Sequence, residues 1–148
     1  MILLLLTGCD HGFTPPLKGK IEGRIVFKGT TPPSDQIKGL YFAAAPFTPC
    51  ATDEILTRFN EVAISGDMKS ALPGQTQTSF EISDVNPGLY TYAGVFQQYG
   101  TNLLDIRPVA VYAENRGTFA VSSGQTASIQ ITVDFDQLPP FPPASCQP

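Results

Sequence analysis

Alternation of apolar and polar residues is the dominant pattern along the chain, and it predicts short β-strands. It is clearest in residues 127–135, where every second residue is apolar. Because successive side chains of a strand point to opposite faces, this run should bury one face and leave the other in water. The residues expected to face the core are Ile129, Ile131, Val133 and Phe135.

Shorter runs with strand character precede this one and are separated by Gly, Pro, Asn, Asp and Ser. Residues 40–45 are more continuously apolar, which is typical of a central strand. Ser122–Gln125 contains a Gly and is predicted to form a hairpin turn. The pattern predicts an all-β fold, an antiparallel Greek-key sandwich of seven to eight strands. The other predicted strands are residues 19–27, 78–83, 89–96, 106–112 and 117–121.

One segment has a helical period and lies in a long insertion, residues 46–77. Ile55, Leu56 and Phe59 are spaced as on one face of a helix. We therefore expect one short helix over residues 52–60, with Thr52 or Asp53 as its N-cap.

The first residues resemble the signal of bacterial lipoproteins. An apolar run ends in Leu6-Thr7-Gly8-Cys9, which matches the lipobox at all four positions. The run is too short for a spanning helix, which needs about 20 apolar residues. The resemblance implies cleavage before Cys9 and lipidation of that cysteine, so that acyl chains hold the protein at a membrane. No Lys or Arg precedes the run, and the start codon could lie upstream.

These features divide the chain into four parts. The expected parts are a signal peptide (1–8), a lipidated tether (9–17), a β-sandwich domain (18–138) and a Pro-rich tail (139–148). The resemblance places the protein in the bacterial cell envelope, on the periplasmic face or the cell surface. Asp10 follows the lipidated cysteine and leaves the choice between inner and outer membrane open.

Composition narrows the function classes. Hydrophobic residues make up 42% of the 148 residues and charged residues 15%, which is enough apolar material for a core. The net charge is −4 without a Lys/Arg cluster, which argues against nucleic-acid binding. The single histidine, His11, lies in the tether, and no nucleotide-binding, hydrolase or zinc motif occurs. The sequence therefore predicts no enzymatic activity and no cofactor.

Three segments resemble the carboxypeptidase-regulatory-like domain, a relative of the transthyretin (prealbumin) sandwich. Residues 21–27 resemble its first strand, and residues 80–92 resemble its run of Phe-x-Ile followed by Pro-Gly-x-Tyr. Residues 121–131 resemble its closing strand. Residues 131–140 also resemble the end of uncharacterised lipoproteins of Bacteroidota-type bacteria. The resemblance implies a transthyretin-like sandwich that serves as an accessory module without an active site.

Cys50 and Cys146 remain once Cys9 is assigned to lipidation. In an oxidising compartment such a pair predicts a disulfide that closes a loop of 96 residues and holds the tail to the insertion. Free thiols or an intermolecular bond are the alternatives.

The acidic residues lack the spacing of a calcium-binding loop, and exposure to solvent at the surface is the simpler interpretation of them. These acidic residues are Asp53, Glu54, Glu61, Asp67, Asp134 and Asp136.

Ligand contact is predicted in the polar loop at residues 97–102, together with the insertion at residues 46–77, because loops on a rigid sandwich commonly carry binding residues. An ordinary strand connection is the alternative.

The leading hypothesis for the function is a non-catalytic structural or binding module of the envelope. The alternative is a glycan-binding or glycan-processing accessory lipoprotein. Its expected partners are the membrane, through the lipid anchor, and an envelope protein or glycan, with the oligomeric state open. Core packing explains most of the remaining aromatic residues, Tyr41, Tyr90, Tyr92, Phe96 and Tyr112. The candidate ligand contacts in the loop at residues 97–102 are Gln97, Gln98, Tyr99 and Asn102.

Overall fold

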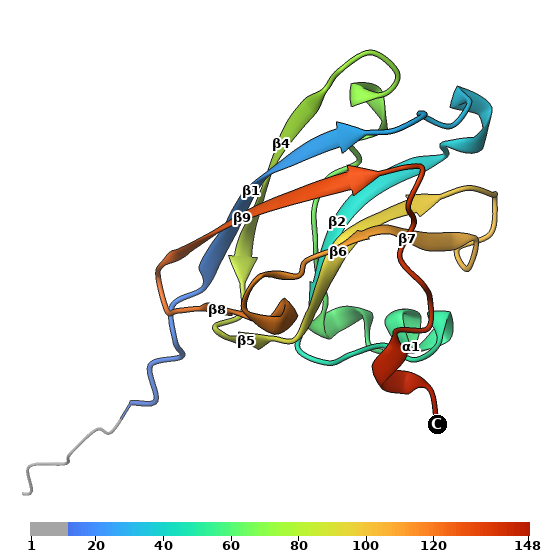
Figure 1. Ribbon diagram of the computed structural model, residues 1–148. Helices are drawn as coiled ribbons and strands as arrows, with labels where there is room; N and C mark the ends of the chain where they lie inside the picture. Colours follow the sequence, from blue (N-terminus) through green and yellow to red (C-terminus); the bar gives the residue numbers. More distant parts are fainter. Residues whose placement is uncertain (1–11) are drawn as a thin grey trace, which may run out of the picture.

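The structure, a computed structural model, describes residues 12–148 and confirms an all-β sandwich (Figure 1). The predictions on the lipobox, Cys9, Asp10 and His11 lie outside the described residues. Within the described part the chain forms nine strands, where seven or eight were predicted. The strands are β1 (Gly19–Lys28), β2 (Gly39–Ala45), β3 (Ala63–Ile64), β4 (Gln77–Val85), β5 (Gly88–Tyr90), β6 (Tyr92–Gln98), β7 (Ile106–Val111), β8 (Phe119–Val121) and β9 (Thr126–Asp134).

Two main sheets form the layers of the sandwich. One has the strand order β4-β1-β9 and the other the order β3-β2-β6-β7. The alternation seen in the sequence places Ile129, Ile131 and Val133 in the core, and Phe135 packs against it, as predicted. Phe42 from the second sheet stacks on Phe80 from the first, with ring centroids 4.3 Å apart. The hydrophobic core therefore lies between the sheets.

Strand pairing departs from a purely antiparallel sandwich at β9. This strand runs parallel to β1, with Ile21 opposite Ala127, whereas β4 pairs with the other edge of β1 in the antiparallel sense. The predicted turn at Ser122–Gln125 exists, with Gly124 at a φ of +69° and Gln125 N donating to Ser122 O at 3.0 Å. It does not join a hairpin, because β8 pairs with β5 and not with β9. The hairpin prediction was therefore wrong, although the turn was placed correctly.

The run predicted as one strand over residues 89–96 is broken at Thr91. Its backbone N–H donates to Ala45 O at 3.0 Å, so the chain leaves β5 and enters the four-stranded sheet as β6. Tyr90 on the β5 side joins the hydrophobic core and stacks on Phe119 at 5.4 Å. The break and the two-residue strand β3 account for the additional strands.

The insertion contains the predicted short helix. It comprises α1 (Thr52–Thr57) followed by the 3₁₀ turn η2 (Phe59–Glu61). The N-cap is Ala51, with no side-chain capping bond, so the prediction of Thr52 or Asp53 in that role was wrong. Glu54 instead accepts a hydrogen bond from the backbone N–H of Cys50, the residue before the N-cap, at 3.0 Å, which ties the start of the helix to the preceding chain.

The Pro-rich tail packs back onto this insertion. It ends in the 3₁₀ turn η5 (Ala144–Cys146), and Cys146 forms a disulfide with Cys50, with Cα atoms 5.4 Å apart. The predicted intramolecular disulfide is thus present. Figure 1 shows the red end of the chain beside α1. No helix of the described residues is long and apolar enough to cross a membrane.

Candidate functional site

The outer face of the four-stranded sheet, on the side away from the core, is apolar. Alternation along β6 sends Ala93 and Val95 into the core and turns Tyr92 and Phe96 to the opposite face. Tyr92 and Phe96 are nonetheless only 6% exposed. A part of the chain outside the three-stranded sheet must therefore cover this face.

The cover is the insertion. Ile55 and Leu56 of α1, Phe59 of η2 and Val62 after it face the sheet across an apolar cavity of about 260 Å³. The residues with helical spacing in the sequence, Ile55, Leu56 and Phe59, thus form the face of the insertion that covers the sheet. The other residues that line the cavity are Tyr41, Ala43, Ala44, Ala45, Pro49, Ile64, Tyr92, Phe96, Gln98, Leu103 and Ile106.

Tyr92 lines this cavity and carries an unusual polar group. Its hydroxyl is fully buried and has no hydrogen-bond partner among residues 12–148. Burial raises the pKa of Tyr92 to about 12, so the hydroxyl is protonated and neutral at physiological pH. By contrast, the buried hydroxyl of Tyr90 donates to Asn86 O at 2.9 Å. Buried polar groups are nearly always paired, so the Tyr92 hydroxyl is an exception: it is closed off from water and has no partner among the described residues.

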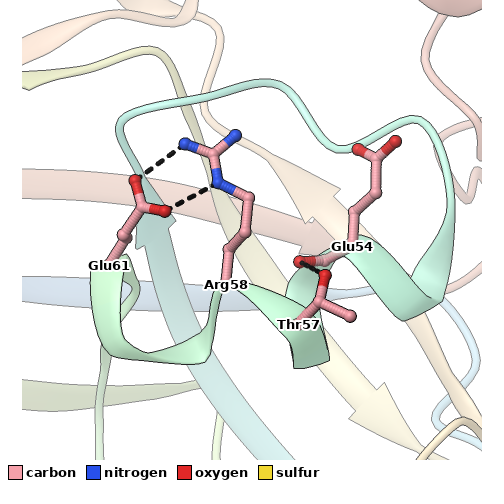
Figure 2. Close-up of polar contacts among 4 residues, drawn as sticks. All are labelled: Glu54, Thr57, Arg58 and Glu61. Carbon is pink, nitrogen blue, oxygen red and sulfur yellow. Dashed lines mark hydrogen bonds and ion pairs between the residues drawn. The ribbon is translucent and has the colours of Figure 1, made fainter.

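Arg58 and Glu61 fix the turn that follows α1. Arg58 donates from Nε and Nη2 to the two carboxylate oxygens of Glu61, both at 2.7 Å (Figure 2). This bidentate pair lowers the pKa of Glu61 and raises that of Arg58. The guanidinium carbon also lies 3.6 Å from the ring centroid of Phe47. Both charges are satisfied at the surface, outside the lining of the cavity.

A second polar contact supports the helix itself. Thr57 Oγ1 donates to the carbonyl oxygen of Glu54 at 3.2 Å (Figure 2). α1 is only six residues long and has no buried residue of its own, so isolated helix formation would be unfavourable. Its position depends on packing over the sheet and on the connections at its two ends.

The disulfide provides the connection at the start of α1. Cys50 lies two residues before the helix, and the preceding residue, Pro49, is fully buried and lines the cavity. The bond therefore joins the tail to the chain segment that forms one wall of the cavity.

The predicted contact residues at 97–102 are distributed over different environments. Gln97 is fully buried, with Nε2 donating to Gln36 O at 2.8 Å and Oε1 accepting from Arg107 Nε at 3.1 Å. Gln98 lines the cavity, and Tyr99 is 46% exposed. The backbone N–H of Asn102 donates to Asp105 Oδ2 at 3.0 Å. The Gln97 side chain thus joins Gln36 to Arg107 in the interior and is not available to a ligand. Tyr99 is the accessible aromatic side chain of this loop.

Tyr99 also borders a second depression on the surface, together with Gln36 and Arg107. The Arg107 guanidinium carbon lies 5.8 Å from the Tyr99 ring centroid, within the range of a cation–π contact. This depression combines an exposed ring with amide and guanidinium groups.

The acidic residues serve local structure where the structure shows their contacts. Asp67 Oδ1 accepts from the backbone N–H groups of Leu40 at 3.0 Å and Lys69 at 2.9 Å. Asp136 Oδ1 accepts from Thr30 N at 3.1 Å, and Asp134 Oδ1 accepts from Asp136 N at 3.0 Å. Between residues 12 and 148 there is no group of three or more His, Cys, Asp or Glu side chains arranged to hold a metal ion.

The sequence predicted a contact surface on the insertion but did not predict the cavity, because it favoured core packing for Tyr41, Tyr92 and Phe96. Two sequence signals could have identified it. The run at residues 40–45 is apolar at nearly every position, which is typical of a strand covered on both faces. The apolar helical face within the insertion supplies the second cover.

Comparison with known proteins adds no relative: no protein-family model, curated protein or solved structure matches this chain.

Proposed function

We propose that this chain is a bacterial envelope lipoprotein, anchored through Cys9, whose sandwich is a non-catalytic binding module. The anchor rests on the Leu6–Cys9 pattern. The disulfide between Cys50 and Cys146 supports an oxidising compartment, since such bonds are rare in the reducing cytosol. A transthyretin-like relationship, suggested by the sequence, would fit an accessory role.

The observation that carries the binding role is the cavity of about 260 Å³ between the sheet and the insertion. Concave apolar sites with a few polar groups are typical of ligand binding. Burial raises the pKa of Tyr92, one of the two tyrosines in the lining of the cavity, to about 12. At neutral pH it is thus a poor general base, which favours binding over acid–base catalysis.

Glycan binding is the second candidate and rests on a different surface. Tyr99 is 46% exposed beside Gln36 and Arg107, in the loop that the sequence singles out. A sugar could lie on the ring and form hydrogen bonds with the amide and guanidinium groups.

Membrane fractionation of Cys9→Ala, with Thr7→Ser as the matched control, tests the anchor. Thr7→Ser keeps a hydroxyl residue in the lipobox and should remain in the membrane fraction, whereas Cys9→Ala should become soluble. Equal retention of both variants would contradict the anchor. Protease treatment of intact cells then locates the sandwich, since digestion indicates the cell surface and protection indicates the periplasm.

A glycan array with the unmodified chain, Tyr99→Ala and Leu89→Ala separates the two binding candidates. Leu89 is 57% exposed and lies outside the depression at Tyr99. Binding that is lost only in Tyr99→Ala would support the glycan candidate. An array without any signal would reject it and leave the cavity as the binding site.

A further inference from the structure

We propose that the depression beside Tyr99 binds a sugar ring that carries an acidic group, with Arg107 holding the acid and Tyr99 the ring. The proposal rests on the glycan candidate above and names the class of sugar. Three observations on the described residues carry it: the uncharged partner of Arg107, the fixed position of its guanidinium and the exposed ring beside it.

Arg107 keeps its positive charge because its partner is an amide. Its Nε donates to Gln97 Oε1 at 3.1 Å, which is the only hydrogen bond that the guanidinium forms with residues 12–148. The ion pairs within that part of the chain involve other cations, namely Lys20, Arg58 and Lys69. The two terminal nitrogens, Nη1 and Nη2, can therefore hold a carboxylate or a phosphate, whose oxygens match the fork of a guanidinium.

The walls of the depression add no negative charge. Among the described residues they are formed by Gln36, Tyr99 and Arg107. Asp105, two residues before Arg107, turns its carboxylate into its own loop, where Oδ2 accepts from the backbone N–H of Asn102 at 3.0 Å. Asp35 is next to Gln36 in the chain but does not line the depression. An anion can thus reach Arg107 without displacing a carboxylate.

Gln97 holds Arg107 in place before a ligand arrives. Gln97 is fully buried, and its Nε2 donates to the backbone carbonyl oxygen of Gln36 at 2.8 Å. The same amide therefore fixes Arg107 relative to the turn that carries Gln36. A side chain that is fixed in advance loses less rotamer freedom when it binds. Gln97 is thus a positioning residue, which contacts Arg107 and not the ligand.

Tyr99 supplies a flat apolar surface next to this charge and is 46% exposed. The guanidinium carbon of Arg107 lies 5.8 Å from the Tyr99 ring centroid, whereas that of Arg58 lies 3.6 Å from the Phe47 ring centroid. Arg107 is therefore not stacked closely on the ring, which can pack against the C–H face of a sugar. The exposed side-chain amide of Gln36 can exchange hydrogen bonds with the hydroxyls of that sugar.

Four small probes separate these contributions. Methyl glucuronide and methyl glucoside share one ring, and only the glucuronide carries a carboxylate. Glucose 6-phosphate carries a phosphate at the corresponding position, and acetate is a carboxylate without a ring. The full chain with Cys9→Ala, folded with its disulfide formed, is titrated with each probe at low salt. The NMR signals of the Arg107 Nε–H and of the Tyr99 ring protons report binding at the depression.

At least one of the two acidic sugars should bind about tenfold more tightly than methyl glucoside and acetate, the value of a hydrogen bond to a charged group. The tighter of the two identifies the acid. Added salt should weaken the acidic sugars and leave methyl glucoside unchanged, because salt screens exposed charges.

Variants assign the two contacts to their residues. Arg107→Gln should remove the preference for acidic sugars, and Arg107→Lys should retain part of it because the charge remains without the fork. Tyr99→Ala should weaken every probe that has a ring. Arg24→Gln is the matched control, since it removes an exposed charge on β1 and should change no affinity. If Arg107→Gln does not fold, Arg107→Lys decides.

Equal affinities for the acidic sugars and methyl glucoside would overturn the proposal and retain the glycan candidate. Acetate binding as tight as that of methyl glucuronide would also overturn it, as would an unchanged preference in Arg107→Gln. Absence of binding by all four probes at millimolar concentration would overturn the proposal together with the glycan candidate. None of these results depends on the anchor or on the cavity. A chain that is soluble in the fractionation experiment but prefers acidic sugars would refute the anchor and retain this site.

Discussion

The sulfur of Cys146 lies 3.8 Å from the carbonyl oxygen of Pro49, the fully buried residue that lines the cavity next to the disulfide. The tail thus contacts the insertion at the point where it starts to cover the sheet. Since α1 has no buried residue and no side-chain N-cap, this junction is a principal restraint on its position. The disulfide should therefore affect both the stability of the sandwich and the shape of the cavity.

The double variant Cys50→Ser/Cys146→Ser should be less stable than the unmodified chain. The bond spans 96 residues, and the chain-entropy relation for a loop of that length gives about 4 to 5 kcal/mol. Urea unfolding measures the difference. A reductant should shift the unmodified chain and not the double variant. Coincident unfolding curves for the two proteins would contradict a stabilising role.

Stability should fall in alkaline solution through Tyr92. Burial raises its pKa to about 12, against about 10 in the unfolded chain, so the folded state holds the proton more tightly. This contribution is complete below pH 10 and is lost as the pH rises through 12. At pH 11 the loss is about 1.4 kcal/mol from this residue. Tyr92→Phe should lose less stability than the unmodified chain between pH 8 and pH 11, as measured by urea unfolding.

Absorbance at 295 nm provides the control for this prediction. The high-pH phase of tyrosine ionisation should lose amplitude in Tyr92→Phe. Burial also raises the pKa of Tyr90, so Tyr90→Phe serves as a comparison within the core. An identical pH dependence of stability in Tyr92→Phe and in the unmodified chain would show that the hydroxyl is accessible to water.

Strands with strict alternation were predictable because one of their faces meets the core and the other meets water. β9 is the clearest example, with Ile129, Ile131 and Val133 buried. Its partner was not predictable in this way. Alternation determines which face is apolar and not which strand lies alongside, so it could not show that β9 runs parallel to β1.

Tyr90 and Tyr92 show where the same reasoning reaches its limit. Two residues apart in one strand, they would share a face, and core packing would explain both. The break at Thr91 places Tyr90 in the core and Tyr92 on the opposite side of the sheet. That break depends on a hydrogen bond to Ala45, which is distant in sequence. Local pattern therefore could not distinguish a packed core tyrosine from one that lines a cavity.

Gly94 should be intolerant of a side chain because β6 and β7 approach closely there. A Cβ atom at this position would collide with the backbone carbonyl oxygen of Ala110. Gly94→Ala should therefore cost about 1 to 3 kcal/mol, as overpacking usually does. At Gly66, in contrast, a Cβ would meet nothing within 4 Å, so Gly66→Ala is the matched control. Thermal unfolding compares the two, and equal melting temperatures would show that the β6–β7 contact adjusts freely.

A substitution of Gln97 tests whether this residue contacts a ligand or holds neighbouring segments together inside the protein. Its side chain joins the carbonyl oxygen of Gln36 to Arg107, and the residue is fully buried. Gln97→Leu keeps the volume but leaves both partners unpaired, so it should cost about 1 to 3 kcal/mol in urea unfolding. Gln98→Leu, on the neighbouring half-buried residue, should change stability by less than about 0.5 kcal/mol. If Gln97→Leu unfolds at the same urea concentration as the unmodified chain, the side chain does not hold β6 to its neighbours. The ligand-contact role predicted from the sequence would then remain open, and glycan binding by Gln97→Leu would be the next measurement.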